Sequence, residues 1–394
     1  MEAYASEWLQ LLIRWVHVIT GVAWIGASFY FVFLDNSLLP PRKKEDAEAG
    51  VGGELWAIHG GGFYHAQKFK VAPQELPEPL HWFKWEAYWT WISGFALLVV
   101  MYYAQANVYM IDRSVADLAP WQAIGISLAL LVIGWIFYDQ LCKRVGLERE
   151  GVIAVSIIAF FAVVAWGLAQ LFSGRAMFMQ VGAMLGTIMT WNVFFVIIPS
   201  QRKLIEAKLR HVPPDSVYGL RGKQRSVHNN YFTLPVLFVM ISNHYPLTYG
   251  DRHAWAVLIA ILLLAAWVRH FFNLRHKGKT VWAIPASAAL GALALAFVIA
   301  PAKPKAAPYA FADVERIMQL RCVSCHAEKP THEGFSVAPK GFLLDTPERI
   351  VANAQKINEQ SVLTRAMPIG NLTSMTDAER STLAAWIAAG ARSR

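Results

Sequence analysis

Long apolar segments recur along most of the chain and are separated by short polar stretches. Each is close to the length of about 20 residues at which an α-helix crosses the hydrocarbon core of a bilayer. The pattern predicts about eight such spans, at residues 8–34, 82–103, 121–141, 151–172, 177–199, 229–247, 254–273 and 281–300. The sixth is the least regular because it contains Pro235 and ends in a polar stretch, so a broken or re-entrant helix is the alternative there. We expect an all-α fold, a polytopic transmembrane helix bundle followed by a small all-α domain.

Composition agrees with a lipid environment for most of the chain. Hydrophobic residues make up 56% of it, charged residues only 16%, and there are 16 tryptophans. Such values are unusual for a water-soluble chain of this length. Membrane lipid is therefore the expected surrounding of the first 300 residues.

Basic residues predict which way the bundle faces. If the spans alternate, most Lys and Arg lie in the loops after the first, third, fifth and seventh spans, whereas the other loops carry one each: Arg113, Arg175 and Arg252. The positive-inside rule places the basic loops in the cytoplasm and both chain ends outside. The net charge of +9 is then explained by these loops, and nucleic acid is not an expected partner.

A haem-attachment motif lies near the C-terminus, at Cys322-Val323-Ser324-Cys325-His326. In C-x-x-C-H motifs the two thiols bind a haem c covalently, and the imidazole of the following histidine ligates the iron. A zinc site would need two more ligands nearby, where His332 is the only other candidate, and a redox C-x-x-C would need a thioredoxin-like fold. The motif therefore favours one covalent haem c held by Cys322 and Cys325, with His326 as iron ligand.

The second axial ligand is expected downstream of the motif. Met367 is the preferred residue because it sits beside Pro368 in a polar, loop-like stretch, and Met–His ligation is common in c-type cytochromes. Met375 is the runner-up. Either methionine could instead simply fill the core.

The end of the chain is predicted to form a cytochrome c domain. A capping box at Thr376 to Glu379 opens a last helix. Residues 301–308 are rich in proline and predict a semi-rigid linker. The expected organisation is an integral membrane catalytic domain at 1–300, the linker at 301–308 and the cytochrome c domain at 309–394.

Ionisable side chains within the apolar region are costly in a bilayer and are candidates for function. On the predicted outer side, His17 and His244 could ligate a b-type haem. The predicted inner side carries a second group: His59, His65, Lys84, Glu86, His228, Asn229 and Asn230. For each the simpler interpretation is a hydrogen-bonded residue at a helix end, or for Lys84 a side chain extending to the membrane surface.

Four strings in the apolar region, together with the haem motif, resemble the membrane-bound urate hydroxylase family: Ile58 to Tyr64, Leu80 to Trp91, Val193 to Pro199 and His228 to Pro235. The similarity covers essentially the whole chain. It implies oxidation of urate to 5-hydroxyisourate in bacterial purine catabolism, with electrons passed to haem c and the respiratory chain rather than directly to oxygen. It also implies the inner membrane, a periplasmic cytochrome c domain, and a periplasmic cytochrome or terminal oxidase as electron acceptor.

Urate is flat, acidic and rich in hydrogen-bonding groups, so its pocket should combine cationic or amide donors with aromatic surfaces and a base. We expect Lys84, His228, Asn229 and Asn230 to bind it and Glu86, His59 or His65 to accept its proton. Electrons would then cross about 30 Å of hydrocarbon, which would require a second cofactor.

Other functions remain open at this point. The chain could be a membrane-anchored cytochrome c subunit that transfers electrons for quinol or another dehydrogenase, or a haem-sensing or metal-transport protein. Nucleotide-binding, nucleophile-elbow and zinc-protease motifs do not occur, which leaves nicotinamide, ATP and hydrolase functions without support.

Overall fold

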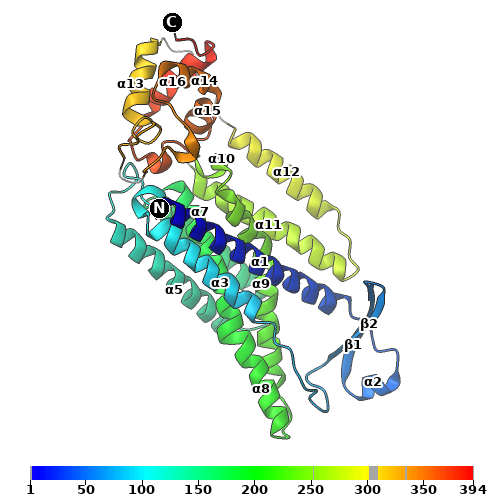
Figure 1. The fold of residues 1–394 in the computed structure, drawn as a ribbon. Coiled ribbons are helices and arrows are strands. Elements are labelled where there is room, and N and C mark those ends of the chain that lie inside the picture. Colours follow the sequence, from blue (N-terminus) through cyan, green and yellow to red (C-terminus); the bar gives the residue numbers. More distant parts are fainter. Residues whose placement is uncertain (1, 252, 301–308, 333–334, 394) are drawn as a thin grey trace.

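The computed structural model describes residues 2–251, 253–300, 309–332 and 335–393, and the predicted linker at 301–308 lies outside them. Long helices run side by side and carry a smaller group of short helices at one end (Figure 1). The predicted helical fold class with membrane-length helices is confirmed.

Each of the eight predicted spans coincides with one helix or with two or three helices joined end to end. Their bounds are α1 Glu2–Ser37, α3 Trp85–Leu97 with η1 Leu98–Tyr103, α5 Pro120–Val145, α6 Glu150–Leu168, α7 Gly174–Asn192 with η2 Val193–Ile197 and α8 Ile198–Leu209, α9 Ser216–Ser242, α11 Ala254–His276 and α12 Ala283–Val298. Among the described residues, five helical segments are long and apolar enough to cross a bilayer: Glu7–Ser37, Pro120–Val145, Glu150–Leu168, Gly174–Leu209 and Ala254–His276. The protein is therefore a membrane protein.

Helix α9 is continuous although it contains Pro235. Its low hydropathy has a structural cause, because its polar residues face the protein interior. Buried side chains on this helix include Gln224, Arg225, His228 and Asn229. A helix that keeps polar groups away from lipid does not need an apolar surface on that side.

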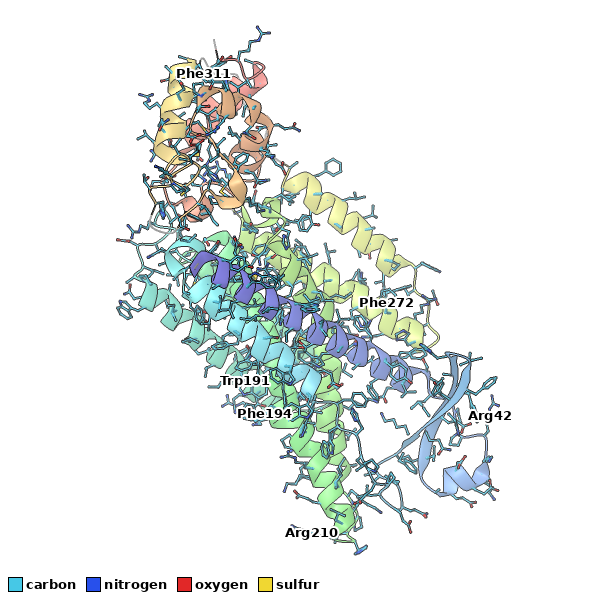
Figure 2. The ribbon with its side chains drawn as sticks, viewed as in Figure 1. Arg42, Trp191, Phe194, Arg210, Phe272 and Phe311 are labelled. Carbon is cyan, nitrogen blue, oxygen red and sulfur yellow. The ribbon has the colours of Figure 1, made fainter. Side chains whose placement is uncertain are left out.

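A β-hairpin was not predicted. Strand β1, Val51–His59, pairs antiparallel with β2, Gly62–Phe69. Gly60 and Gly61 form the turn with φ of +57° and +82°, which glycine adopts without strain. The hairpin and the short helix α2, Lys44–Glu48, lie at the end of the bundle far from the C-terminal helices. Figure 2 places Arg42 and Arg210 toward this end. Both lie in loops that the sequence predicts on the same, basic side of the membrane.

Helix α7 forms the centre of the bundle. Met177, Phe178, Val181 and Met184 are fully buried in one core that also includes residues of α5, α6, α9 and α11. Close packing depends on small residues along α7, since an added β-carbon at Gly182 would collide with Val239 of α9.

The C-terminal unit, residues 309–332 and 335–393, has a separate core. Its elements are α13 Phe311–Arg321, η3 Pro339–Gly341, α14 Pro347–Ala352, α15 Ala354–Ile357, η4 Asn358–Leu363, η5 Ile369–Asn371 and α16 Asp377–Ala388. Trp386, Leu383, Val314 and Met318 are fully buried in this core. The Thr376 hydroxyl and Glu379 form the predicted capping box at the start of α16.

The C-terminal unit rests directly on the end of the bundle. Gly370, with φ +55°, packs so closely against the segment that includes α4 Ala106–Tyr109 that a β-carbon would lie 3.0 Å from the Val108 carbonyl oxygen. Gly250, which follows α10 Pro246–Tyr249, packs in the same way against the carbonyl oxygen of Thr364 in the C-terminal unit. These two backbone contacts hold the unit over the helix ends.

Two glycines one turn apart on α7 allow the packing to be tested. Gly182→Ala should lower the melting temperature in detergent, because overpacking against Val239 costs about 1–3 kcal/mol. Gly186→Ala should leave it equal or raise it, because a β-carbon there meets no atom within 4 Å. Equal melting temperatures for the two variants would contradict this packing.

Candidate active site

A cavity of about 1970 Å³ connects the C-terminal unit with the interior of the bundle. Its upper walls include Cys322, Cys325 and His326, and its lower walls reach Thr187 and Thr190 of α7. The haem motif and the bundle interior therefore share one continuous space.

The side chains of the haem motif are compatible with the predicted haem attachment. The Nδ1 of His326 lies 2.8 Å from the carbonyl oxygen of Phe342. A carbonyl oxygen only accepts, so Nδ1 carries the proton and Nε2 keeps a free lone pair for a metal. Burial raises the pKa of the Cys322 thiol to about 12, and burial also raises the pKa of the Cys325 thiol.

Both thiols line the same cavity as the His326 imidazole. No cluster of three or more His, Cys, Asp or Glu that could hold a metal occurs in the described part of the chain. The residues present fit haem c, with Cys322 and Cys325 holding it and His326 ligating the iron. The group would supply a one-electron redox centre there.

Both candidate methionines line the cavity. The backbone of Met367 is held on both sides, since its N–H donates to the Gln360 carbonyl at 2.8 Å and its carbonyl accepts from Arg380 at 2.8 Å. Met375 is only 4% exposed and belongs to the core of the C-terminal unit. Met367 thus stays the predicted axial ligand, and Met375 has a packing role of its own.

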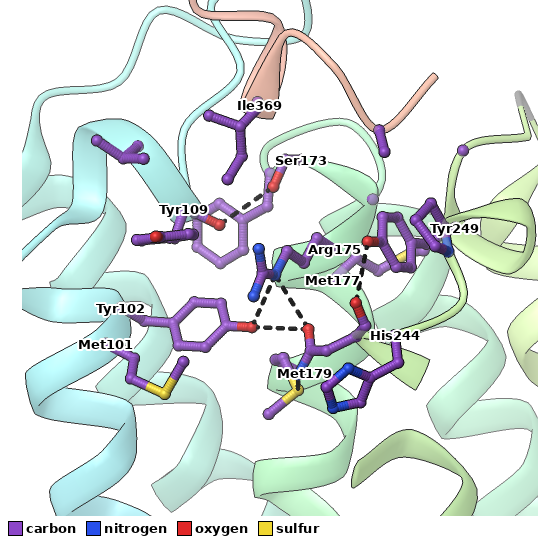
Figure 3. A pocket seen from close by; sticks show the side chains of 18 of the residues that line it. Met101, Tyr102, Tyr109, Ser173, Arg175, Met177, Met179, His244, Tyr249 and Ile369 are labelled. Atoms are coloured by element: carbon purple, nitrogen blue, oxygen red, sulfur yellow. Dashed lines mark hydrogen bonds between the residues drawn. The ribbon is translucent and has the colours of Figure 1, made fainter. Parts of the chain in front are cut away.

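A second group of polar side chains lines the cavity where it enters the bundle (Figure 3). Arg175, in the first turn of α7, donates from Nε to the Tyr102 hydroxyl at 3.3 Å and to Asn243 Oδ1 at 3.1 Å. The Tyr102 hydroxyl donates to the same Asn243 oxygen at 3.0 Å. Tyr249, the last residue of α10, donates from its hydroxyl to the Asn243 carbonyl oxygen at 3.4 Å. We call these residues and Tyr109 the Arg175 cluster.

The Arg175 cluster is suited to a flat anion. The guanidinium lies 4.9 Å from the ring centre of Tyr109 and 5.9 Å from that of Tyr102. Within the described residues it forms no ion pair with a carboxylate. A half-buried arginine that is surrounded by aromatic rings and an amide, without a carboxylate partner among the described residues, has the chemistry to pair with an anionic ring.

Two histidines line the same cavity as the Arg175 cluster. His244, just beyond the end of α9, lies on the lower side of the pocket in Figure 3. His17 lies deeper, on α1, where Nδ1 is 3.0 Å from the Thr90 carbonyl oxygen and 3.2 Å from Ser93 Oγ. His17 and His244, which were predicted to lie on the outer side, therefore line the same cavity.

The predicted inner-face residues near the hairpin do not line this cavity. Lys84 precedes α3, with Nζ 5.8 Å and 5.4 Å from the ring centres of Trp82 and Trp85. Glu86 lies in the first turn of the same helix. His59 is exposed at the hairpin turn, while His65 stacks on Trp56 and its Nε2 lies 2.8 Å from Glu54. The structure does not bring these four residues together.

His228 and Asn229 belong to a buried hydrogen-bonded network. His228 Nε2 lies 2.8 Å from Glu150, and its Nδ1 lies 2.7 Å from the Tyr138 hydroxyl. Asn192 donates both to that hydroxyl, at 3.1 Å, and to Asn229 Oδ1, at 2.9 Å. Both ring nitrogens of His228 are thus engaged within the protein.

Asn230 forms a separate contact, with Arg269 of α11. Its Oδ1 accepts a hydrogen bond from Arg269 Nε at 2.9 Å, and the Arg269 guanidinium packs 4.1 Å from the ring centre of Phe29. Asn230 is fully buried. None of the predicted binding residues on α9 is among the residues that line the large cavity.

Sequence reasoning missed the Arg175 cluster. Its members come from η1, α4, α7, the end of α9 and α10, so no local spacing joins them. The one available signal was Arg175 itself, a single basic residue at the start of an apolar helix.

The axial ligand can be tested by paired substitutions. Met367→Ala should shift the haem c reduction potential and change its absorption, because loss of an axial ligand changes the coordination of the iron. Met375→Ala should mainly lower thermal stability, by about 2–5 kcal/mol for a buried methionine. Redox titration and thermal unfolding of both variants separate the two roles, and a normal potential in Met367→Ala would show that another residue is the ligand.

Comparison with known proteins identifies the family. No curated protein and no solved structure matches the chain. The family described as urate oxidase N-terminal matches residues 3–300, which include every helix of the bundle and the whole Arg175 cluster. The chain belongs to the urate oxidase N-terminal family.

Proposed function

We propose that the protein oxidises urate to 5-hydroxyisourate within the bundle and passes the electrons to a haem c bound at Cys322, Cys325 and His326. Family membership supports an oxidation of urate. The observation that carries the proposal is the single cavity shared by the Arg175 cluster and the haem motif. A periplasmic cytochrome or terminal oxidase of the bacterial inner membrane would take the electrons onward.

The reaction adds one oxygen atom from water to urate and releases two electrons and two protons. Arg175 would pair with the urate anion, and the Asn243 side chain would orient that arginine through its hydrogen bond at 3.1 Å. The rings of Tyr102 and Tyr109 would flank the flat substrate. His244, which lines the same cavity, is the nearby candidate to accept a proton from urate or from the attacking water.

This location differs from the predicted inner-face site. A urate molecule near Lys84 and Glu86 would lie outside the cavity that the haem motif lines. The Arg175 cluster lies directly beneath the C-terminal unit, with Ile369 of that unit over the pocket in Figure 3. Electron transfer falls steeply with distance, so the geometry favours the Arg175 cluster.

The first test is anaerobic reduction of haem c by urate. Arg175→Met should raise the urate concentration needed for half-maximal reduction roughly 10- to 100-fold, the effect of losing a charged hydrogen bond. Arg113→Met is the matched control, because Arg113 is an exposed basic residue in a neighbouring loop, 3.9 Å from Asp117 and outside the cavity lining.

Unchanged urate dependence in Arg175→Met would contradict the proposed binding site. Reduction of wild-type haem c by quinol but not by urate would overturn the proposed function and favour an electron-transfer subunit. The haem c potential of Arg175→Met is a third readout, because a shifted potential with normal urate dependence would mean that Arg175 serves the haem.

The contact between unit and bundle can be tested separately. Gly370→Ala should slow haem c reduction by urate, because the added methyl group presses on the Val108 and Ile111 carbonyls, 3.0 Å and 3.1 Å away. Gly341→Ala shares the positive φ, +64°, and carries the same backbone strain, but meets no atom within 4 Å. Stopped-flow reduction rates should therefore fall in the first variant only, and an equal loss in both would point to strain within the unit.

A further inference from the structure

His17 has the hydrogen bonding of a metal ligand. Its Nδ1 lies 3.0 Å from the Thr90 carbonyl oxygen, which can only accept, so Nδ1 carries the proton. Ser93 Oγ donates to the Trp89 carbonyl at 2.6 Å and can accept from the same Nδ1 at 3.2 Å. No hydrogen bond engages Nε2 within the described residues, so this nitrogen is available to a ligand. Ligating histidines commonly bind a backbone carbonyl through the second ring nitrogen in this way.

The same arrangement occurs at His326, whose Nδ1 also donates to a backbone carbonyl, that of Phe342 at 2.8 Å. Both imidazoles line one cavity. By contrast, the rings of His228, His270 and His65 bond side chains of Glu150, Tyr231 and Glu54. His17 thus matches the predicted iron ligand of the C-terminal unit in its bonding.

The space around His17 suits a flat, largely apolar group. Small residues from three helices line it: Gly21 on α1, Gly94 on α3 and Gly182, Ala183 and Gly186 on α7. A β-carbon at Gly94 would lie 2.8 Å from His17 Cε1, and one at Gly186 would meet no atom within 4 Å. The first glycine lets the imidazole lie against α3, and the second leaves open space within the bundle.

A cation lies one helical turn from His17. Arg14 precedes it by three residues, on the same face of α1, and also lines the cavity. Its Nη2 donates to the sulfur of Met101 at 3.1 Å, a weak acceptor, and the described residues give it no carboxylate partner. An arginine on a membrane-spanning helix requires an anion or water.

We propose that the bundle binds a non-covalent b-type haem, with His17 Nε2 as axial ligand and Arg14 as the partner of its propionates. An imidazole with a free nitrogen, a glycine-lined apolar space and a cation one turn away together match the chemistry of that cofactor. Urate fits this deeper part less well, because Val18, Val22, Phe95 and Leu98 provide apolar walls there. The cavity, at about 1970 Å³, also exceeds the range of about 300–1,000 Å³ typical of a single ligand.

The b-type haem would have a role in the proposed reaction, and this role rests on the proposed function. Urate gives up two electrons, whereas each haem iron accepts one. With two haems lining one cavity, both electrons can leave urate without waiting for an external acceptor. The binding site itself does not depend on urate being the substrate.

The test is a haem count on the whole purified protein. Acid–acetone extracts non-covalent haem and leaves covalent haem c on the chain. Wild-type protein should release one haem per chain, identified as haem b by its pyridine haemochrome spectrum. His17→Gly should release less than a tenth of that amount and keep its full haem c content, which shows that the chain is folded and inserted.

Two further variants complete the test. Imidazole added to His17→Gly during haem reconstitution should restore the bound haem, because the cavity left by the side chain accepts the free ligand. His270→Ala is the matched control, a histidine on a membrane helix whose Nδ1 lies 2.7 Å from the Tyr231 hydroxyl, and should keep the wild-type haem content.

The proposal is overturned if wild-type protein releases no haem, or if His17→Gly retains it. Neither result would affect the urate dependence of haem c reduction. Conversely, a protein that carries extractable haem b but does not respond to urate would retain this site and lose the proposed function.

Discussion

The structure is governed by the requirement that a polar group in a membrane helix finds a partner within the protein. Around α9, His228, Glu150, Tyr138 and Asn192 bond one another, although the buried Oδ1 of Asn192 has no hydrogen-bond partner among the described residues. Beneath the C-terminal unit, polar groups open onto the cavity instead. Arg175, Arg14 and the Nε2 of His17 face the cavity, so ligands rather than side chains are their expected partners.

The helices were predictable because lipid imposes a simple pattern on sequence. Apolar runs of membrane length located all eight helical segments, including α9, whose Pro235 left the helix intact. The hairpin and the polar extension α8 were missed because they lie beyond the apolar segments, where hydropathy carries no information. The turn at Gly60 and Gly61 was the one local signal of the hairpin.

The candidate site, like the fold, could be predicted from the sequence only in part. The haem motif was found because its chemistry fixes the spacing of Cys322, Cys325 and His326 within five residues. The Arg175 cluster was not found because Arg175 lies 73 residues from Tyr102 and 68 from Asn243 in the chain. Only packing of separate helices brings such residues together. His17 is an intermediate case. Its position in an apolar segment made it a candidate ligand in the sequence, but only the structure shows that its Nδ1 bonds the Thr90 carbonyl oxygen.

The close contact of Gly370 and Thr364 with the helix ends also sets an order of assembly. Cys322 is 8% exposed and lines a cavity that the bundle also encloses. A haem bonded to both thiols, as proposed, would lie between the C-terminal unit and the helix ends. Docking of the unit on the bundle would then follow haem attachment as the last step of assembly.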